Sequence, residues 1–198
     1  MDFLLLLPIA LVALWIARGR QQQRRIAILA RYLSGHDIEQ NIETLSQGYS
    51  RALGESDLAR SEQVWGVLRE TESILCRQVR KLAEDFAGVE PTATRVSKFP
   101  IWLPRSPALD KSFDMREALR MHSRGICRAV DEQGASPKDR AFVILAEMLL
   151  MQHTCHWYCR SKSVVSARML ASHRTSYEQL VEAVLPQTRH EYLGLVVA

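Results

Sequence analysis

The stretch DLARSEQVWGVLRETESILCRQVRKLAEDFA, residues 57–87, has a heptad-like pattern that largely decides the fold. Its apolar side chains recur at spacings of three, four or seven residues, as they do along one face of an α-helix. They are Trp65, Leu68, Leu75, Val79, Leu82 and Phe86. A helix over these residues would be roughly 45 Å long at about 1.5 Å per residue. That length favours a helical bundle or a coiled coil. The stripe can face the same chain or a second copy, so self-association is an open alternative.

Helical periodicity continues before this stretch. Asp37 can cap a helix that ends at Gly54, and its inward face would carry Ile38, Ile42, Leu45, Tyr49 and Leu53. Residues 37–88 are therefore predicted to form a long helical hairpin.

The same period continues after residue 112. Asp114 and Ser136 are candidate caps of two further helices. The second would continue towards Leu185, where Pro186 ends it, and as an alternative residues 161–163 divide it in two. Residues 113–198 would thus complete an antiparallel, all-α bundle. A chain of 198 residues, 47% hydrophobic and 24% charged, suffices for one such domain with its own core.

Residues 89–112 interrupt the helical pattern because they contain four prolines. We interpret them as a crossover between helix pairs. Their motif FPIWLP either packs on the bundle, which we favour, or offers a docking strip to a partner protein; its apolar side chains are Phe99, Ile101, Trp102 and Leu103.

The amino terminus predicts a membrane anchor. FLLLLPIALVALWIA, residues 3–17, has no charge. It is shorter than the roughly 20 residues that usually span a bilayer, but Trp15 can lie at the interface and Arg18 can extend towards the headgroups. We therefore expect an uncleaved transmembrane anchor over residues 1–20, with a cleaved signal peptide or a buried helix as alternatives.

Basic residues follow the apolar segment, and residues 21–36 continue as a juxtamembrane basic, amphipathic helix. The positive-inside rule predicts a single-pass protein whose bulk is cytoplasmic and whose anchor contacts membrane lipids; the arginines concerned are Arg18, Arg20, Arg24 and Arg25. Arginine greatly outnumbers lysine, a bias common in GC-rich bacterial coding, so we expect a bacterial protein whose anchor lies in the inner membrane. The net charge of +4 also admits nucleic acid, a weaker alternative.

The motif HTCHWYC, residues 153–159, raises the question of a metal or redox site. Cys155, His156 and Cys159 would share one helix face, but zinc needs a fourth ligand, such as His122 or Cys127, from a second helix. We favour a core role without a cofactor and keep zinc as the alternative. All four cysteines are interpreted as reduced thiols.

The sequence contains no phosphate-binding loop, nucleophile elbow or His-Glu-x-x-His motif. Carboxylates such as Glu70 and Glu72 are interpreted as solvated. The prediction is therefore a scaffold or interaction module with a membrane anchor rather than an enzyme. The alternatives are a metal or redox protein and a membrane-tethered, nucleic-acid-associated protein.

Overall fold

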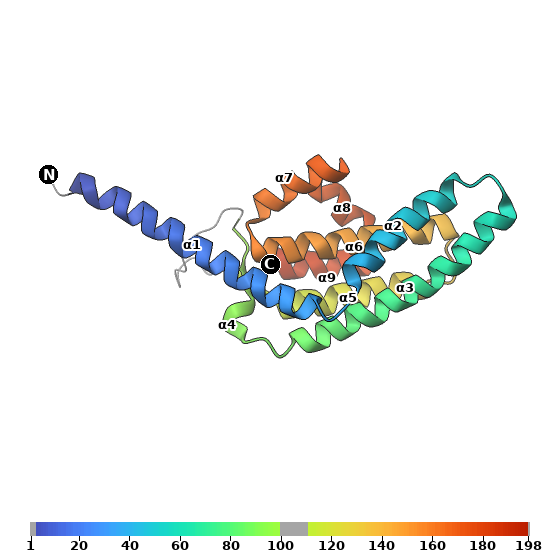
Figure 1. Ribbon diagram of the computed structural model, residues 1–198, viewed down its shortest axis with the longest axis horizontal. Helices are drawn as coiled ribbons and strands as arrows, with labels where there is room; N and C mark the ends of the chain where they lie inside the picture. Colours follow the sequence, from blue (N-terminus) through green and yellow to red (C-terminus); the bar gives the residue numbers. More distant parts are fainter. Residues whose placement is uncertain (1–2, 100–110, 198) are drawn as a thin grey trace.

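A computed structural model describes residues 3–99 and 111–197 (Figure 1). These residues form an almost entirely helical bundle with one small antiparallel sheet, which confirms the all-α prediction in the main. The elements are α1 (Phe3–Leu33), α2 (Ile38–Gly54), α3 (Leu58–Phe86), α4 (Pro91–Thr94), β1 (Arg95–Ser97), β2 (Ser112–Asp114), α5 (Met115–Asp131), α6 (Pro137–Cys159), α7 (Lys162–His173), α8 (Tyr177–Ala183) and α9 (Pro186–Val196).

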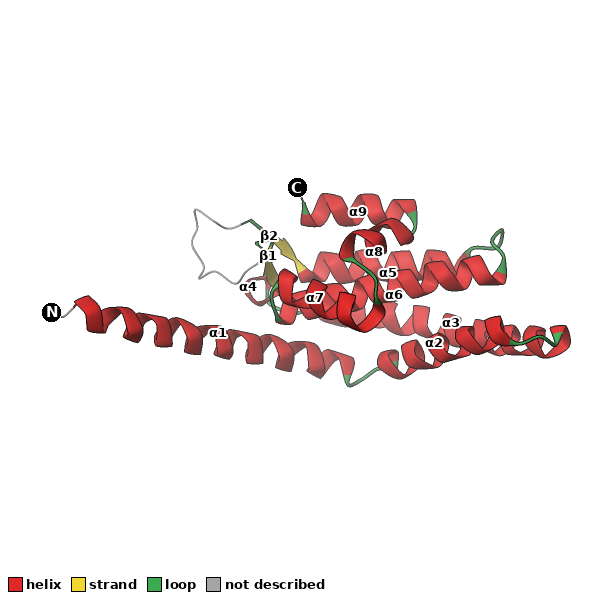
Figure 2. Ribbon diagram, turned by 90° about the horizontal axis from the view of Figure 1, so that it is seen from above, coloured by secondary structure: helices red, strands yellow, loops and turns green. Residues whose placement is uncertain are grey.

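Four long helices build the core of the bundle. α3 packs against α2 and α5, and α5 packs against α6 and α9. Helices α7 and α8 follow α6 and return along it, as Figures 1 and 2 show. The predicted hairpin thus corresponds to α2 and α3.

The predicted apolar stripe of α3 is buried inside this bundle. Leu68, Leu75, Val79, Leu82 and Phe86 all belong to the core. Because α2 and α5 pack on α3, the stripe is covered by helices of the same chain. Trp65 departs from the prediction, since it is only half-buried at the edge of the core.

Several helix boundaries follow the predicted capping signals. The Ser136 hydroxyl accepts a hydrogen bond from the Asp139 N–H at 3.1 Å, and the Asp114 carboxylate accepts one from the Arg116 N–H at 2.9 Å. Asp37 precedes α2 without a capping hydrogen bond from its side chain. Pro186 begins α9 instead of ending a helix, because proline suits the first helical turn.

The predicted inward face of α2 is correct except at its end. Ile38, Ile42, Leu45 and Tyr49 are buried, whereas Leu53 is exposed and Ala52 is buried in its place. The helix has turned far enough by its last residues that position 53 faces solvent.

The proline-rich crossover contains β1 and ends at the first residue of β2, and the helical prediction missed this sheet. Strands β1 and β2 pair in antiparallel register, with Val96 opposite Phe113 and both side chains buried. Two isolated strands of three residues give almost no alternating pattern in the sequence, so periodicity could not reveal them.

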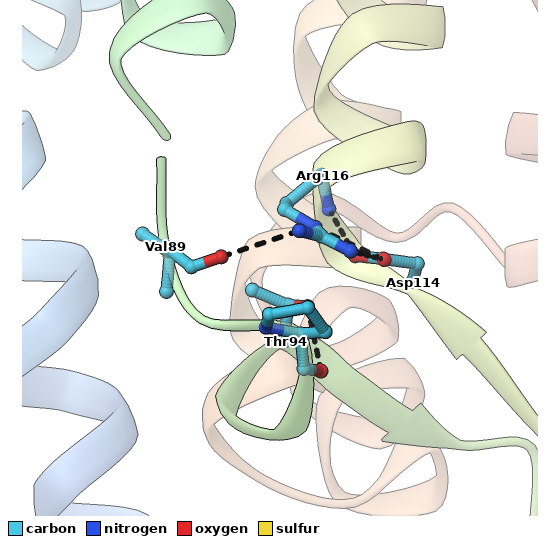
Figure 3. Close-up of polar contacts among 5 residues, drawn as sticks. Val89, Thr94, Asp114 and Arg116 are labelled. Atoms are coloured by element: carbon cyan, nitrogen blue, oxygen red, sulfur yellow. Dashed lines mark hydrogen bonds and ion pairs between the residues drawn. The ribbon is translucent and has the colours of Figure 1, made fainter. Parts of the chain in front are cut away.

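The end of the sheet is joined to the end of α3 by Arg116 (Figure 3). Its guanidinium forms an ion pair with Asp114 at 2.5 Å and donates to the Val89 carbonyl at 3.3 Å. Within the predicted docking strip, Phe99 is half-buried. The other three positions, Ile101, Trp102 and Leu103, lie outside the described residues, so the docking role stays a prediction.

A disulfide connects α3 to α5. Cys76 and Cys127 are joined by an S–S bond of 2.07 Å, and both residues are buried. The interpretation of all four cysteines as reduced thiols is therefore wrong for this pair. Helical spacing could not reveal the bond, because the two cysteines are 51 residues apart in the sequence.

The amino-terminal part of α1 leaves the bundle. Figures 1 and 2 both show it extending away from the other helices. Every side chain from residue 7 to residue 17 is exposed, including Leu7 at 66% and Trp15 at 76%. Across residues 3–99 and 111–197, no helix has both the length and the apolar character needed to cross a membrane.

The close crossing of α2 and α3 gives a stability prediction. A Cβ atom on Gly48 would lie 2.3 Å from Cδ2 of the buried Leu68, so Gly48→Ala is expected to destabilise the protein by about 1–3 kcal/mol. Gly66→Ala is the matched control. Nothing lies within 4 Å of a Cβ at Gly66, and alanine is the better helix former there by about 0.5–1 kcal/mol. Urea unfolding followed by circular dichroism should show that Gly48→Ala lowers the free energy of unfolding and that Gly66→Ala raises it. Equal stabilisation by both substitutions would contradict the close contact between α2 and α3.

Candidate functional site: a groove between α1, α2, α6 and α7

A cavity of about 680 Å³ lies where the second half of α1 meets α2, α6 and α7. Its volume falls within the range of roughly 300–1,000 Å³ that is typical of small-molecule sites. The lining comes from three regions of the sequence: residues 26–42, 151–160 and 164–168. We call this cavity the groove.

The inner surface of the groove is apolar. Leu29, Ile38, Ile42 and Met151 line it and belong to the hydrophobic core. Leu29 lies near the end of α1, Ile38 and Ile42 lie near the start of α2, and Met151 lies in the second half of α6. Because α6 contacts both α1 and α2, these four side chains line one cavity.

The rim of the groove carries charges of both signs on opposite walls. Arg160 and Arg168 lie on the α6–α7 wall, and Asp37 and Glu39 lie on the α1–α2 wall. All four residues are exposed. Within the described part of the chain, none of the four forms an ion pair, so these charges face the opening without a partner.

Three of the four predicted metal ligands line this groove, namely Cys155, His156 and Cys159. Burial, together with the neighbouring Cys159 and Glu39, raises the pKa of the Cys155 thiol to about 12. Burial likewise raises the pKa of Cys159 to about 11, although Arg25 and Arg160 act in the opposite direction. Both thiols are therefore protonated at neutral pH, whereas zinc binds the thiolate.

His156 lies on the α6–α7 wall of the groove. Partial burial and the positive charge of Arg168 lower its pKa, and Glu39 acts against them. The imidazole is therefore neutral at pH 7.

The fourth predicted ligand, His122, lies elsewhere. It is fully buried on α5, and its Nε2 atom lies 2.9 Å from the Thr154 hydroxyl. Because Thr154 donates its own proton to the Leu150 carbonyl at 2.9 Å, Nε2 of His122 must be the donor. Burial lowers the pKa of His122 to about 3, so the ring is neutral.

The metal prediction therefore lacks its expected geometry. His122 is hydrogen-bonded to Thr154, and Cys127 is held in the disulfide with Cys76. In residues 3–99 and 111–197, no group of three or more His, Cys, Asp or Glu side chains is arranged to hold a metal ion. Cys155 and Cys159 themselves lie in the hydrophobic core, as the favoured interpretation of HTCHWYC states.

Among the four predicted membrane-interface arginines, Arg25 has contacts within the bundle. Its guanidinium donates to the carbonyls of Tyr158, at 3.1 Å, and of Arg95, and it lies 5.2 Å from the centre of the Tyr158 ring. These contacts hold the second half of α1 against α6 and β1. Arg20 and Arg24 are exposed and Arg18 is half-buried, so lipid contact stays a prediction for these three.

A buried polar cluster in the centre of the bundle was missed. Glu72 is 1% exposed, accepts a hydrogen bond from the Tyr49 hydroxyl at 2.8 Å and lies 3.4 Å from Arg140. The interpretation of Glu72 as a solvated carboxylate is wrong. A signal was present, because Glu72 lies four residues after Leu68 and three before Leu75, on the apolar stripe itself.

A second buried carboxylate lies below the start of α9. Glu147 accepts a hydrogen bond from the Leu185 N–H at 3.0 Å. Burial raises its pKa to about 7, although the Thr188 hydroxyl and the Leu185 N–H favour the charged form.

Comparisons with models of protein families, with curated proteins and with solved structures found no match.

Proposed function

We propose that this protein is a membrane-anchored interaction module, whose helical bundle is held at a lipid surface by the first part of α1. One observation carries the proposal: from residue 7 to residue 17 every side chain is exposed, and most of these side chains are large and apolar. A contiguous apolar surface of this kind marks a site of contact with a membrane or another protein. The all-round exposure favours lipid, because a protein partner would normally cover only one face.

Arginines at the end of this segment support the proposal. Arg20 and Arg24 are exposed within the next two turns of α1, where they can contact anionic headgroups. Trp15 is suited to the interface, since its ring is apolar and its N–H can bind water or a headgroup.

We propose that the bundle binds a partner and does not catalyse a reaction. The nucleophiles in the groove, Cys155 and Cys159, are held as neutral thiols by burial. A groove with an apolar interior and an unpaired charged rim has the features of a binding site.

The anchor is tested by flotation of the full chain with lipid vesicles. Each lysine near the centre of a membrane-inserted helix costs roughly 2.5–3.5 kcal/mol. Leu11→Lys combined with Leu14→Lys is therefore expected to move the protein from the floating to the soluble fraction. Phe142→Lys is the matched control, because Phe142 is 61% exposed on α6, outside the proposed anchor. If the double variant floats as well as the unchanged chain, α1 is not the anchor.

The side of the membrane is a separate part of the proposal. The arginines after the apolar segment favour a cytoplasmic bundle, whereas the disulfide between Cys76 and Cys127 favours an oxidising compartment. We give more weight to the arginines, because their effect acts during insertion, before the bundle folds. A carboxy-terminal reporter active only in the cytoplasm should then be active.

A further inference from the structure

We infer that the groove binds one acyl chain of a phospholipid whose headgroup carries both a phosphate and an ammonium group. The inference deepens the proposed function and rests on the membrane attachment of α1. It follows from three features of the groove: its apolar interior, its two oppositely charged walls and its distance from the anchor.

The interior fits an alkyl chain. Its lining side chains, among them Leu29, Leu33, Ile38 and Met151, are aliphatic or a thioether and offer an acyl chain mainly dispersion and hydrophobic contact. The two thiols that also line it are neutral, so they add no charge to the interior.

The rim fits a headgroup with charges of both signs. Arg160 and Arg168 can hold a phosphate from the α6–α7 wall, and Arg forms strong, directional contacts with phosphate oxygens. Asp37 and Glu39 can hold an ammonium group from the α1–α2 wall. A headgroup that is only anionic would meet the two carboxylates without a compensating cation, so the rim disfavours it.

The position of the groove also fits lipid. Ile26, the first lining residue on α1, comes nine residues after the end of the apolar segment at Ala17. At about 1.5 Å per residue this is roughly 13 Å along the helix, which is comparable with the depth of a headgroup layer plus the start of the water phase. An acyl chain can therefore enter the groove while the second chain of the same lipid stays in the bilayer.

Photolabelling of the full chain in phosphatidylglycerol vesicles tests the inference. The vesicles contain a small fraction of either phosphatidylethanolamine or phosphatidylglycerol with a photoreactive diazirine on one acyl chain, and labelled peptides are located by mass spectrometry. The ethanolamine probe is expected to label both α1 residues 3–17 and groove residues such as Met151 and Ile42. The glycerol probe should label the groove less by a factor of about five, as expected for the loss of one or two exposed charge contacts.

Three variants make the assignment specific. Val164 lines the groove and is 44% exposed, so Val164→Trp can fill the opening without disturbing the core. It should remove most groove labelling and leave labelling of residues 3–17 unchanged. Val67→Trp is the matched control, on an exposed position of α3 outside the groove, and should change neither. Glu39→Lys should abolish the preference for the ethanolamine probe.

The possible failures are distinguishable. Labelling confined to residues 3–17 would overturn the groove inference and leave the anchor intact. Equal groove labelling by both probes would overturn the proposed headgroup chemistry. A full chain that does not associate with the vesicles would overturn the proposed function, and the inference with it.

Discussion

Arg140→Met is expected to lower the free energy of unfolding by roughly 3–5 kcal/mol, the largest effect of a single substitution that we predict. Arg140 is 4% exposed in the first turn of α6 and lies 3.4 Å from the buried Glu72. Without Arg140 the buried Glu72 side chain loses its ion-pair partner, and an uncompensated polar group in the core costs free energy. Urea unfolding of the full chain in mild detergent measures the loss.

A double substitution separates the loss of stability caused by the unpaired charge from the loss caused by poorer packing. Arg140→Met with Glu72→Gln leaves no unpaired charge, and the Gln carbonyl can still accept the hydrogen bond of Tyr49. This variant should recover a large part of the lost stability. Arg60→Met is the surface control, because its ion pair with Asp57 is exposed and long, at 3.8 Å, and is worth at most about 1 kcal/mol. If the double variant is no more stable than Arg140→Met, the pair is not coupled.

Glu147→Gln should stabilise the protein increasingly as the pH rises from about 5 to 8. The folded-state pKa of Glu147 is raised from an ordinary value of 4.5 to about 7. Its contribution to stability is thus fully present below about pH 4.5 and is lost as the pH rises through 7. Gln has no proton to lose and stays neutral, so the variant avoids this cost, which is of the order of 3 kcal/mol.

The measurement is the difference in unfolding free energy between Glu147→Gln and the unchanged chain at several pH values. The difference is needed because His122 and His153 have pKa values lowered to about 3 and 4, mainly by burial. These histidines stabilise the folded state increasingly as the pH rises towards 6.5, opposite to Glu147. Their effects cancel in the difference. A difference that does not change between pH 5 and 8 would show that Glu147 titrates normally.

The bundle could be predicted from the sequence where local signals and burial agree. The α3 stripe from Leu68 to Phe86 is periodic over several turns, and the caps at Asp114 and Ser136 have side chains that bind their own helix. Such features depend on residues that are close in the sequence. They can therefore be predicted from the sequence without knowledge of how the helices pack.

The features that were missed depend on residues distant in the sequence. The disulfide of Cys76 with Cys127 and the contacts of Arg25 with Tyr158 each require the relative placement of two helices. The groove is a property of four converging helices, so its lining residues share no local motif. For the motif HTCHWYC, the helical spacing correctly placed Cys155 and Cys159 on the same side of α6. The hydrogen bond of His122 with Thr154 could not be predicted, because it depends on how α5 packs against α6.

α1 is a single unbroken helix from Phe3 to Leu33, so no hinge separates its projecting half from the half that lines the groove. The contacts of Arg25 with Tyr158 and Arg95 fix the rotation of this helix about its own axis. Helices inserted in bilayers of different thickness change their tilt. If α1 is inserted in a membrane as we propose, such a change in tilt would move Ile26, Leu29 and Leu33 relative to α6. On that proposal, the width of the groove would depend on the thickness of the membrane.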